Sequence, residues 1–253
     1  MNGDKIMFEI NGYTKQLGII GYPVEHTFSP NMHNFISETV HNNYVYGAWC
    51  VKPEDLKDAI NGMRALGISG INVTAPHKVE VMKYIDVVTD GAKKLGSVNT
   101  VVNRDGKLYG YNTDADGFCM ALTKAGIEIE NSRILIIGAG GVVRPTLIRL
   151  IDNKPKSITV VNRTKSKVKM LAEDILKSTG FEVNTEIDKL EFDIVINTTS
   201  AGMEPQENVM PIDNIEEIND LSFINENTAA VDMIYNPDKT LFLQEAEKRG
   251  AKF

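Results

Sequence analysis

Arg133-Ile-Leu-Ile-Ile-Gly-Ala-Gly-Gly-Val-Val-Arg144 joins a short apolar run to a cluster of glycines. The run from Ile134 to Ile137 has the β-branched composition of a strand buried on both faces. Apolar residues recur at helical spacing from Leu147 to Ile151. Strand, glycine turn and helix, in that order, form the context that a dinucleotide fingerprint requires. We therefore predict an α/β domain of the Rossmann type with a parallel sheet around this turn.

The glycine turn itself is the predicted pyrophosphate site. Its backbone N–H groups can approach a phosphate, and the positive end of the following helix dipole stabilises the negative charge. The third glycine of the G-x-G-x-x-G pattern would fall at position 143, where Val143 stands instead. Such a turn can also be purely structural. The residues predicted to bind the cofactor here are Gly138, Ala139, Gly140 and Gly141.

The next predicted strand, Ser157 to Val161, indicates which dinucleotide binds. NAD-binding chains place an acidic residue after this strand, whereas this chain has Asn162-Arg163-Thr164 and then two lysines. A guanidinium can hold a 2′-phosphate with two hydrogen bonds, and a carboxylate would repel it. The alternative is that the basic residues only begin a solvated helix. We predict NADP as the cofactor, bound here by Asn162, Arg163, Thr164 and Lys167.

Length and composition exclude several classes of protein. The chain has 253 residues, enough for two domains, and a net charge of −7 with both signs interspersed. An acidic surface is repelled by nucleic acid, so we expect no nucleic-acid partner. No apolar run is long enough to span a membrane, and the polar start is not a signal peptide. Cys50 and Cys119 lack metal spacing, so we predict reduced structural thiols, no metal and a cytoplasmic location.

The first half of the chain also alternates strands and helices. Strands are predicted over residues 15–22, 44–51 and 70–74, and helices after Ser29-Pro30, over residues 53–66, and after Pro76. This alternation predicts a parallel-sheet α/β domain. Polar residues follow its strands at the edge where open α/β sheets bind ligands. They are Thr27, Ser29, Asn72, Thr74 and Lys78.

Thr27 and Ser29 lie on a loop between a strand and a helix, a place that often holds small anions. The alternative is that Ser29 only caps the helix, with Pro30 at the first helical position, and that Thr27 only contacts water. Spacing alone favours this simpler interpretation.

A hairpin over residues 97–111, with Asp105-Gly106 at its turn, leads to the junction between the two halves. We expect the hinge near Thr113 to Asp116, before a long helix. The predicted domains are residues 1–113 for substrate binding and catalysis and 114–235 for NADP. Strands over 193–197 and 229–235 complete the second sheet. Residues 236–253 are predicted to form a C-terminal helix that returns toward the first domain.

Lys78 and Asp114 are the natural catalytic pair. Hydride transfer needs a group that exchanges the alcohol proton and a cage that orients the reacting carbon. A partly buried lysine can exchange the proton, or a charged lysine can donate to a developing alkoxide, and an aspartate can orient it. Lys78 could instead be a solvated first-turn residue. The four histidines show no metal-ligand pattern, and we interpret His77 as structural.

Ordered motifs along the chain resemble the shikimate dehydrogenase family, from about Leu17 to about Gly250. Gly21-Tyr-Pro-Val-Glu-His-Thr-Phe-Ser-Pro30 is similar to the family's first loop, and Gly70-Ile-Asn-Val-Thr-Ala-Pro-His-Lys78 matches its G-x-N-V-T-x-P-x-K. The remaining matches are Gly96-Ser-Val-Asn-Thr100, Gly110-Tyr-Asn-Thr-Asp-Ala-Asp-Gly117, Gly138-Ala-Gly-Gly141 with Arg144, Asn162-Arg-Thr164 and Asp232-Met-Ile-Tyr-Asn-Pro237.

This resemblance implies reversible reduction of 3-dehydroshikimate to shikimate with NADPH, in aromatic amino acid biosynthesis. It implies that Lys78 and Asp114 are catalytic, with Lys78 exchanging the proton. Thr27, Ser29 and Tyr235 would hold the substrate carboxylate, while Thr74, Asn99 and Asp114 would bind the ring hydroxyls. Met233 joins the cofactor contacts.

Three positions depart from the family pattern. Thr27 replaces the usual serine, and its added methyl could shift the preference between shikimate and quinate. Val143 is bulkier than the usual residue and could weaken pyrophosphate packing. The sequence ends at Phe253, before the family's segment with a substrate-binding glutamine, and Gln244 is not that residue. We expect either a longer protein or a missing substrate contact.

Two alternatives remain beside this enzyme. A quinate/shikimate dehydrogenase using NAD would need an acidic residue near Asn162-Arg163. A non-catalytic regulator of the same fold could sense a metabolite without turnover, and it could lose the Lys78–Asp114 pair. The expected partner is a small-molecule substrate, and the expected assembly is a monomer or a homodimer.

Overall fold

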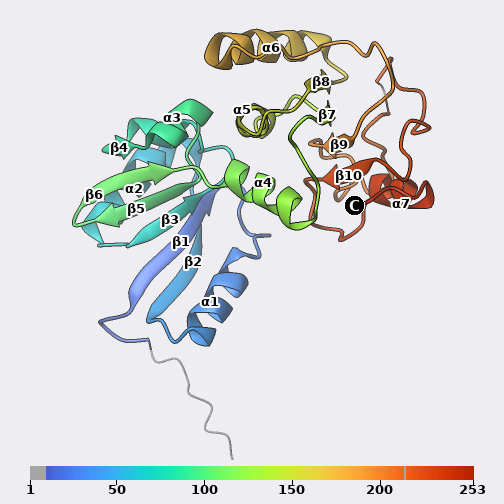
Figure 1. The fold of residues 1–253 in the computed structure, drawn as a ribbon. Coiled ribbons are helices and arrows are strands. Elements are labelled where there is room, and N and C mark those ends of the chain that lie inside the picture. Colours follow the sequence, from blue (N-terminus) through green and yellow to red (C-terminus); the bar gives the residue numbers. More distant parts are fainter. Residues whose placement is uncertain (1–9, 214) are drawn as a thin grey trace, which may run out of the picture. The chain divides into compact units, whose positions relative to one another are not determined.

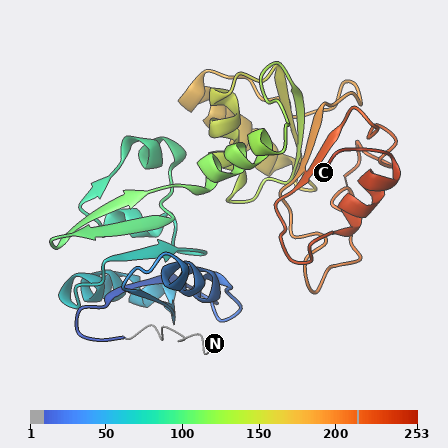
Figure 2. The ribbon, with the colours of Figure 1, turned by 60° about the horizontal axis from the view of Figure 1, so that its bottom comes forward.

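A computed structural model describes residues 10–213 and 215–253, and the chain divides after Asp114 into two compact units (Figure 1). Each unit contains one sheet with helices packed around it, as a second view also shows (Figure 2). The α/β class predicted from the sequence is confirmed. The functions assigned to the segments 1–113, 114–235 and 236–253 stay predictions.

Within its described residues, 10–114, the first unit contains six strands. They are β1 (Lys15–Gly21), β2 (Tyr44–Cys50), β3 (Gly70–Val73), β4 (Val87–Val88), β5 (Thr100–Arg104) and β6 (Lys107–Tyr111). The helices are α1 (Ser29–Thr39), α2 (Leu56–Ala65) and α3 (Asp90–Leu95), with short 3₁₀ turns η1 (Pro53–Asp55) and η2 (Glu80–Lys83). Helix α4 (Asp114–Lys124) then begins at the boundary between the units.

The first sheet has the strand order β2-β1-β3-β5-β6-β4. Strands β2, β1 and β3 are parallel, but β5 runs antiparallel to both β3 and β6. The predicted hairpin is confirmed, with Asp105 and Gly106 both at positive φ in its turn. The predicted parallel pairing holds for β2, β1 and β3, and the two-residue turn of the hairpin returns the chain antiparallel within the same sheet.

The helix predicted after Pro76 is wrong. Residues 75–79 form turns, and only the short η2 follows. The carbonyl of Lys78 accepts a hydrogen bond from Val98 N at 2.8 Å, so the main chain at Lys78 is bonded across to another segment. The His77 side chain is buried, with Nε2 2.7 Å from the Val51 carbonyl, which supports its structural interpretation. These two long-range bonds compete with a regular helix here.

The core of the first unit lies between the sheet and α2. Ile60 and Met63 of α2 are fully buried and belong to one cluster with Val73, Val101 and Leu108 of the strands. This packing holds the ends of β3 and β5 in a fixed register, and of the predicted site residues Lys78 follows β3 and Asn99 precedes β5.

Over residues 115–213 and 215–253, the second unit contains four strands and, after α4, three helices. They are β7 (Arg133–Ile137), α5 (Val143–Asp152), β8 (Ser157–Val161), α6 (Lys165–Thr179), β9 (Ile194–Asn197), β10 (Ala229–Asp232) and α7 (Leu241–Lys248). The sheet order is β10-β9-β7-β8, and all three pairings are parallel, as predicted for this half. The glycine turn therefore follows an inner strand of the sheet, between β7 and α5.

Helix α7 belongs to the core of the second unit. Phe242 and Ala246 are fully buried in one cluster with Leu135 and Ile137 of β7. Helix α7 therefore packs on the second sheet, and the predicted return of residues 236–253 toward the first domain stays a prediction.

Across residues 10–213 and 215–253, no helix is long and apolar enough to cross a membrane. In the same ranges, no group of three or more His, Cys, Asp or Glu side chains is arranged to hold a metal ion. Cys50 and Cys119 are free thiols, the first exposed and the second buried. Burial raises the pKa of the Cys119 thiol to about 11, so it stays protonated at neutral pH.

Candidate active site

Three predicted site residues meet in the first unit. Lys78 follows β3, Asn99 precedes β5, and Asp114 is the first residue of α4. Lys78 Nζ donates to Asp114 Oδ2 at 2.6 Å, and Asn99 Nδ2 donates to Asp114 Oδ1 at 2.6 Å. Both carboxylate oxygens are therefore held, and the aspartate is fixed between a cation and an amide.

Neighbouring hydrogen bonds fix the backbone around Asp114. Asn112 Oδ1 accepts a hydrogen bond from the Asp114 N–H at 3.1 Å, and Asn99 Oδ1 accepts from the Thr113 N–H at 3.0 Å. Asn112 is itself buried and donates to Ser97 Oγ at 2.8 Å. The start of α4 is therefore positioned by side chains from the segment that precedes β5.

The ion pair is accessible to a ligand. The Lys78 side chain is 31% exposed and that of Asp114 50% exposed, although Asn99 is buried. Lys78 Nζ uses one N–H in the bond to Asp114 and has further N–H groups for a substrate oxygen.

Thr27 and Ser29 meet in the loop before α1. The Thr27 hydroxyl donates to Ser29 Oγ at 3.1 Å, and the Ser29 N–H donates to Thr27 Oγ1 at 3.3 Å. Ser29 is the first residue of α1, and Phe28 holds the N-cap position without a side-chain capping bond. The interpretation of Ser29 as a simple helix cap is therefore wrong.

Thr74 follows β3 and packs closely against β1. A side chain at Gly21 would place its Cβ 2.3 Å from the Thr74 methyl, so glycine is needed there for this approach. Tyr235 belongs to the second unit, after β10, and its side chain is exposed. Its part in binding a substrate carboxylate stays a prediction.

The glycines of the turn after β7 have different roles. Gly138 has φ +122°, and a Cβ there would lie 2.3 Å from Thr198 Oγ1, so the fold requires glycine. A Cβ at Gly140 or Gly141 would meet nothing within 4 Å. The chain's own packing thus does not explain these two glycines, whereas a ligand that approaches the backbone does.

The start of α5 fits an anionic group. No side chain caps this helix, and its first turn contains no acidic residue. Its N–H groups and dipole are therefore available to a pyrophosphate. Val143 is completely buried at the first position of α5, so its bulk lies in the core rather than in the open space beside the turn.

The basic residues after β8 are exposed at the start of α6. Asn162 Nδ2 donates to the Thr164 carbonyl at 3.2 Å, which shapes the turn. Lys165 forms ion pairs with Glu216 and Glu217, both at 2.9 Å. In the described part of the chain, the side chains of Arg163 and Lys167 have no partner, so both cations are available to a phosphate.

A buried amide network beneath the glycine turn was not predicted. Asn197 at the end of β9 is fully buried and donates to both carboxylate oxygens of Asp232 at 3.1 Å. The Met233 N–H donates to the Asn197 carbonyl at 3.0 Å, which places Met233 directly after β10. The signal for this network is the polar run Asn197-Thr-Thr-Ser200 after an apolar strand, a pattern that suits a ligand-binding edge.

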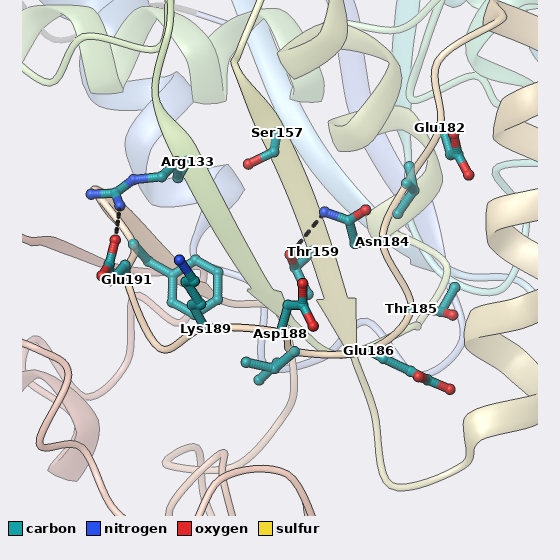
Figure 3. Close-up of a pocket in the computed structure, with 13 residues that line it drawn as sticks. Arg133, Ser157, Thr159, Glu182, Asn184, Thr185, Glu186, Asp188, Lys189 and Glu191 are labelled. Atoms are coloured by element: carbon teal, nitrogen blue, oxygen red, sulfur yellow. Dashed lines mark hydrogen bonds and ion pairs between the residues drawn. The ribbon is translucent and has the colours of Figure 1, made fainter.

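A polar cavity of about 490 Å³ lies elsewhere in the second unit, along β8 (Figure 3). Residues 182–192 form one side of it, and Asn184 pairs with Thr159 of β8. None of the predicted site residues lines this cavity. The predicted site consists instead of two polar surfaces, one in each unit.

Comparison with known families decides the identity. Residues 19–101 match the shikimate dehydrogenase substrate binding domain, and residues 120–235 match the shikimate/quinate 5-dehydrogenase domain. The chain belongs to the shikimate dehydrogenase family.

Relatives and solved structures of this family align over nearly the whole chain. The shikimate dehydrogenase (NADP⁺) of Methanococcus aeolicus is 42% identical over 246 residues, which are 95% of this chain and 86% of that protein. A crystal structure of a shikimate dehydrogenase in complex with NADP⁺ aligns with a TM-score of 0.87 and 41% identity, over 96% of this chain and 85% of the other. A shikimate 5-dehydrogenase from Listeria monocytogenes, in complex with shikimate and NAD, aligns with a TM-score of 0.88 and 32% identity, over 98% and 88%.

Proposed function

We propose that this chain catalyses the reversible, NADPH-dependent reduction of 3-dehydroshikimate to shikimate. The Lys78–Asp114–Asn99 cluster is the observation that carries the proposal, since it places a charged proton donor and two orienting groups at one accessible point. Family membership supports the reaction, and the residues of the cluster supply its acid–base chemistry.

Lys78 acts as the proton donor in the direction of reduction. Its ammonium group gives a proton to the substrate oxygen as negative charge develops there, and Asp114 holds the ammonium in place at 2.6 Å. In the reverse direction, the neutral amine takes the hydroxyl proton. Asn99 holds the second oxygen of Asp114 and so limits rotation of the carboxylate.

The remaining predicted substrate residues orient the ring. Thr27 and Ser29 present two adjacent hydroxyls, which can donate hydrogen bonds to a carboxylate together with Tyr235. Thr74, Asn99 and Asp114 bind the ring hydroxyls. A substrate fixed at its carboxylate and at its hydroxyls exposes one carbon in one orientation, which is the positioning that hydride transfer requires.

The second unit holds the cofactor, which supplies the hydride when bound. Gly138, Ala139, Gly140 and Gly141 form the turn for the pyrophosphate, and Met233 lies at the end of β10. Arg163 and Lys167 bind the 2′-phosphate, with Asn162 and Thr164 shaping the turn between them. The open space at Gly140 and Gly141 and the two unpartnered cations fit this group.

Steady-state oxidation of shikimate and of quinate, each with NADP⁺ and with NAD⁺, tests the proposal. We expect turnover of shikimate with NADP⁺ to exceed the other three combinations. Faster turnover of quinate with NAD⁺ would instead identify the chain as a quinate/shikimate dehydrogenase. Binding of shikimate by calorimetry without any turnover would identify a metabolite-binding regulator.

The absence of an acidic residue at Asn162-Arg163 and the retained Lys78–Asp114 pair both support the enzyme over its two alternatives.

We further propose that the protein acts in the cytoplasm as a monomer or a homodimer. Light scattering after size exclusion measures the assembly, and a mass above that of two chains would contradict it.

A further inference from the structure

Three side chains on the strands of the first unit form a hydrogen-bonded path that ends at Asn99. Tyr46 lies on β2, Asn72 on β3 and Thr100 on β5. The Tyr46 hydroxyl donates to Asn72 Oδ1 at 2.7 Å, although β1 lies between their strands. The Asn72 amide donates in turn to Thr100 Oγ1 at 3.3 Å, and the Thr100 hydroxyl donates to Asn99 Oδ1 at 2.9 Å.

Burial raises the pKa of Tyr46 to about 12, so its hydroxyl stays protonated and can donate a hydrogen bond at neutral pH. Hydrogen bonds therefore run from Tyr46 through Asn72 and Thr100 to Asn99. Asn99 binds Asp114 directly, so the path ends at the ion pair with Lys78.

The Tyr46 ring is held on several sides. Its main chain exchanges two hydrogen bonds with the Asn34 side chain of α1, at 2.8 and 2.9 Å. The ring of His33 stacks on that of Tyr46 with centroids 4.3 Å apart. Tyr46 itself is buried. The phenol oxygen can therefore occupy only a small region, and it serves as a fixed point for Asn72.

Asn72 has one orientation in this arrangement. Its carbonyl oxygen accepts from Tyr46, and its amide donates to Thr100 and, at 3.4 Å, to the Asn99 carbonyl. A flipped amide would set its NH₂ against the Tyr46 hydroxyl proton and its oxygen against the Asn99 carbonyl oxygen. Removing one member leaves a half-buried polar group without its partner, which costs about 1–3 kcal/mol.

We propose that Tyr46 and Asn72 are positioning residues, which orient the Asn99 amide for the ring hydroxyls of the substrate. Neither needs to touch the substrate. This inference rests on the proposed function, because that function assigns Asn99 to the ring hydroxyls. It adds the residues that hold this amide in place.

Tyr46→Phe tests the first link because it removes one oxygen and keeps the stacked ring. We expect the KM for shikimate to rise about 10-fold, as for the loss of one hydrogen bond to an otherwise unsatisfied acceptor, with the KM for NADP⁺ unchanged. Tyr44→Phe is the matched control, since Tyr44 lies two residues earlier on the same strand and we expect wild-type constants for it. Equal KM values for Tyr46→Phe and Tyr44→Phe would overturn the proposal.

The double variant Tyr46→Phe/Asn72→Ala tests whether the residues act as one unit. We expect Asn72→Ala to lower kcat as well as raise KM, because Asn99 and then Asp114 lose a fixed neighbour. The double variant should be no worse than Asn72→Ala alone, since coupled residues are not additive. A loss of kcat/KM in the double variant that equals the product of the two single losses would contradict the network. A lower melting temperature with unchanged KM and kcat would contradict it too.

Failure of the proposed function is separable from failure of this inference. A wild-type chain without turnover contradicts the function, whatever the variants do. In that case, calorimetric binding of shikimate still compares Tyr46→Phe with Tyr44→Phe. Weaker binding of shikimate only in Tyr46→Phe supports the positioning role. Equal binding in the two variants contradicts it.

Discussion

The two halves of the predicted site differ in how their polar groups are held. In the first unit, Lys78, Asp114 and Asn99 are bonded to one another, and the bonds continue to Asn72 and beyond. In the second unit, the side chains of Arg163 and Lys167 are exposed and, within the described residues, unpartnered. The polar groups of the first half are therefore bonded to one another without a ligand. The second half instead presents backbone with open space beside it and two cations that have no partner among the described residues.

This difference follows from the chemistry of the two ligands. A small substrate has few atoms to hold, and its reacting carbon must be placed within a fraction of an ångström, so its contacts need to be ordered in advance. A dinucleotide brings two phosphate groups of its own and a large contact area. Exposed arginine and lysine can close on a 2′-phosphate and gain strong charge-assisted bonds.

Removing the cation of the ordered half should have the largest effect. For Lys78→Ala we expect kcat/KM to fall about 1,000-fold, the order of magnitude of a lost general acid. NADP⁺ binding measured by fluorescence should be unchanged, because Lys78 belongs to the first unit. Lys83→Ala is the control, since this exposed lysine only pairs with Glu80 three residues away. A Lys78→Ala variant with a near-normal rate would show that Lys78 does not transfer the proton.

Reversing the charge of the open half should change the cofactor preference. For Arg163→Glu we expect the ratio of kcat/KM for NADPH over NADH to fall about 100-fold, because a charge-assisted pair is lost and a repulsion is added. Turnover with NADH should be nearly unchanged. Lys169→Glu carries the same charge change further along α6 and controls for net charge. The same fall in both variants would show that Arg163 has no specific contact.

The two kinds of glycine in the turn separate folding from binding. We expect Gly138→Ala to lower the free energy of unfolding by about 2 kcal/mol, because φ is positive there and a Cβ would clash with Thr198. Gly140→Ala should leave stability unchanged or slightly higher and raise the Kd for NADP⁺ about 10-fold. Thermal unfolding and calorimetry measure the two effects. Unchanged affinity in Gly140→Ala would mean that no ligand approaches this backbone.

Local patterns predicted the second unit well because its signals lie close together in sequence. The apolar run before Gly138 and the helical spacing after it specify strand, turn and helix within about 20 residues. The parallel sheet and the exposed Arg163 follow from the same alternation. The irregular backbone near Lys78 could not be predicted from local sequence, because the Lys78 carbonyl accepts a hydrogen bond from Val98, far along the chain.

The polar network of the first unit could not be predicted for the same reason. Tyr46 and Asn72 lie 26 residues apart, on strands separated by β1. Their contact depends on the register of three strands, and a lone tyrosine in a strand pattern suggests only packing. Ser29 shows the opposite error: its local position indicates a helix cap, whereas Phe28 holds the N-cap position and the Ser29 hydroxyl accepts a hydrogen bond from Thr27.

The smallest effect should come from an ion pair that supports the second sheet at the end away from the glycine turn. Arg133 at the start of β7 binds Asp193 before β9 through two side-chain bonds, at 2.9 and 3.1 Å, and Asp193 also accepts from the Arg133 N–H. The Arg133 side chain holds the pKa of Asp193 below its ordinary value, chiefly through these hydrogen bonds. The unfolded chain therefore binds more protons at this carboxyl than the folded chain does.

The stabilisation by Asp193 should be complete above about pH 4, the ordinary range of an aspartate, and should be lost as pH falls through the lower folded pKa. For Asp193→Asn we expect a loss of about 0.5–1 kcal/mol at pH 7, reduced from the value of a buried pair because both side chains are more than one third exposed to solvent. The loss should vanish in strong acid, and NADP⁺ affinity should stay unchanged. Glu191→Gln is the control, since this partner of Arg133 is more exposed and should matter less. A weaker affinity for NADP⁺ in Asp193→Asn would show that the open half also depends on ordered polar bonds, and the contrast between the two units would then narrow.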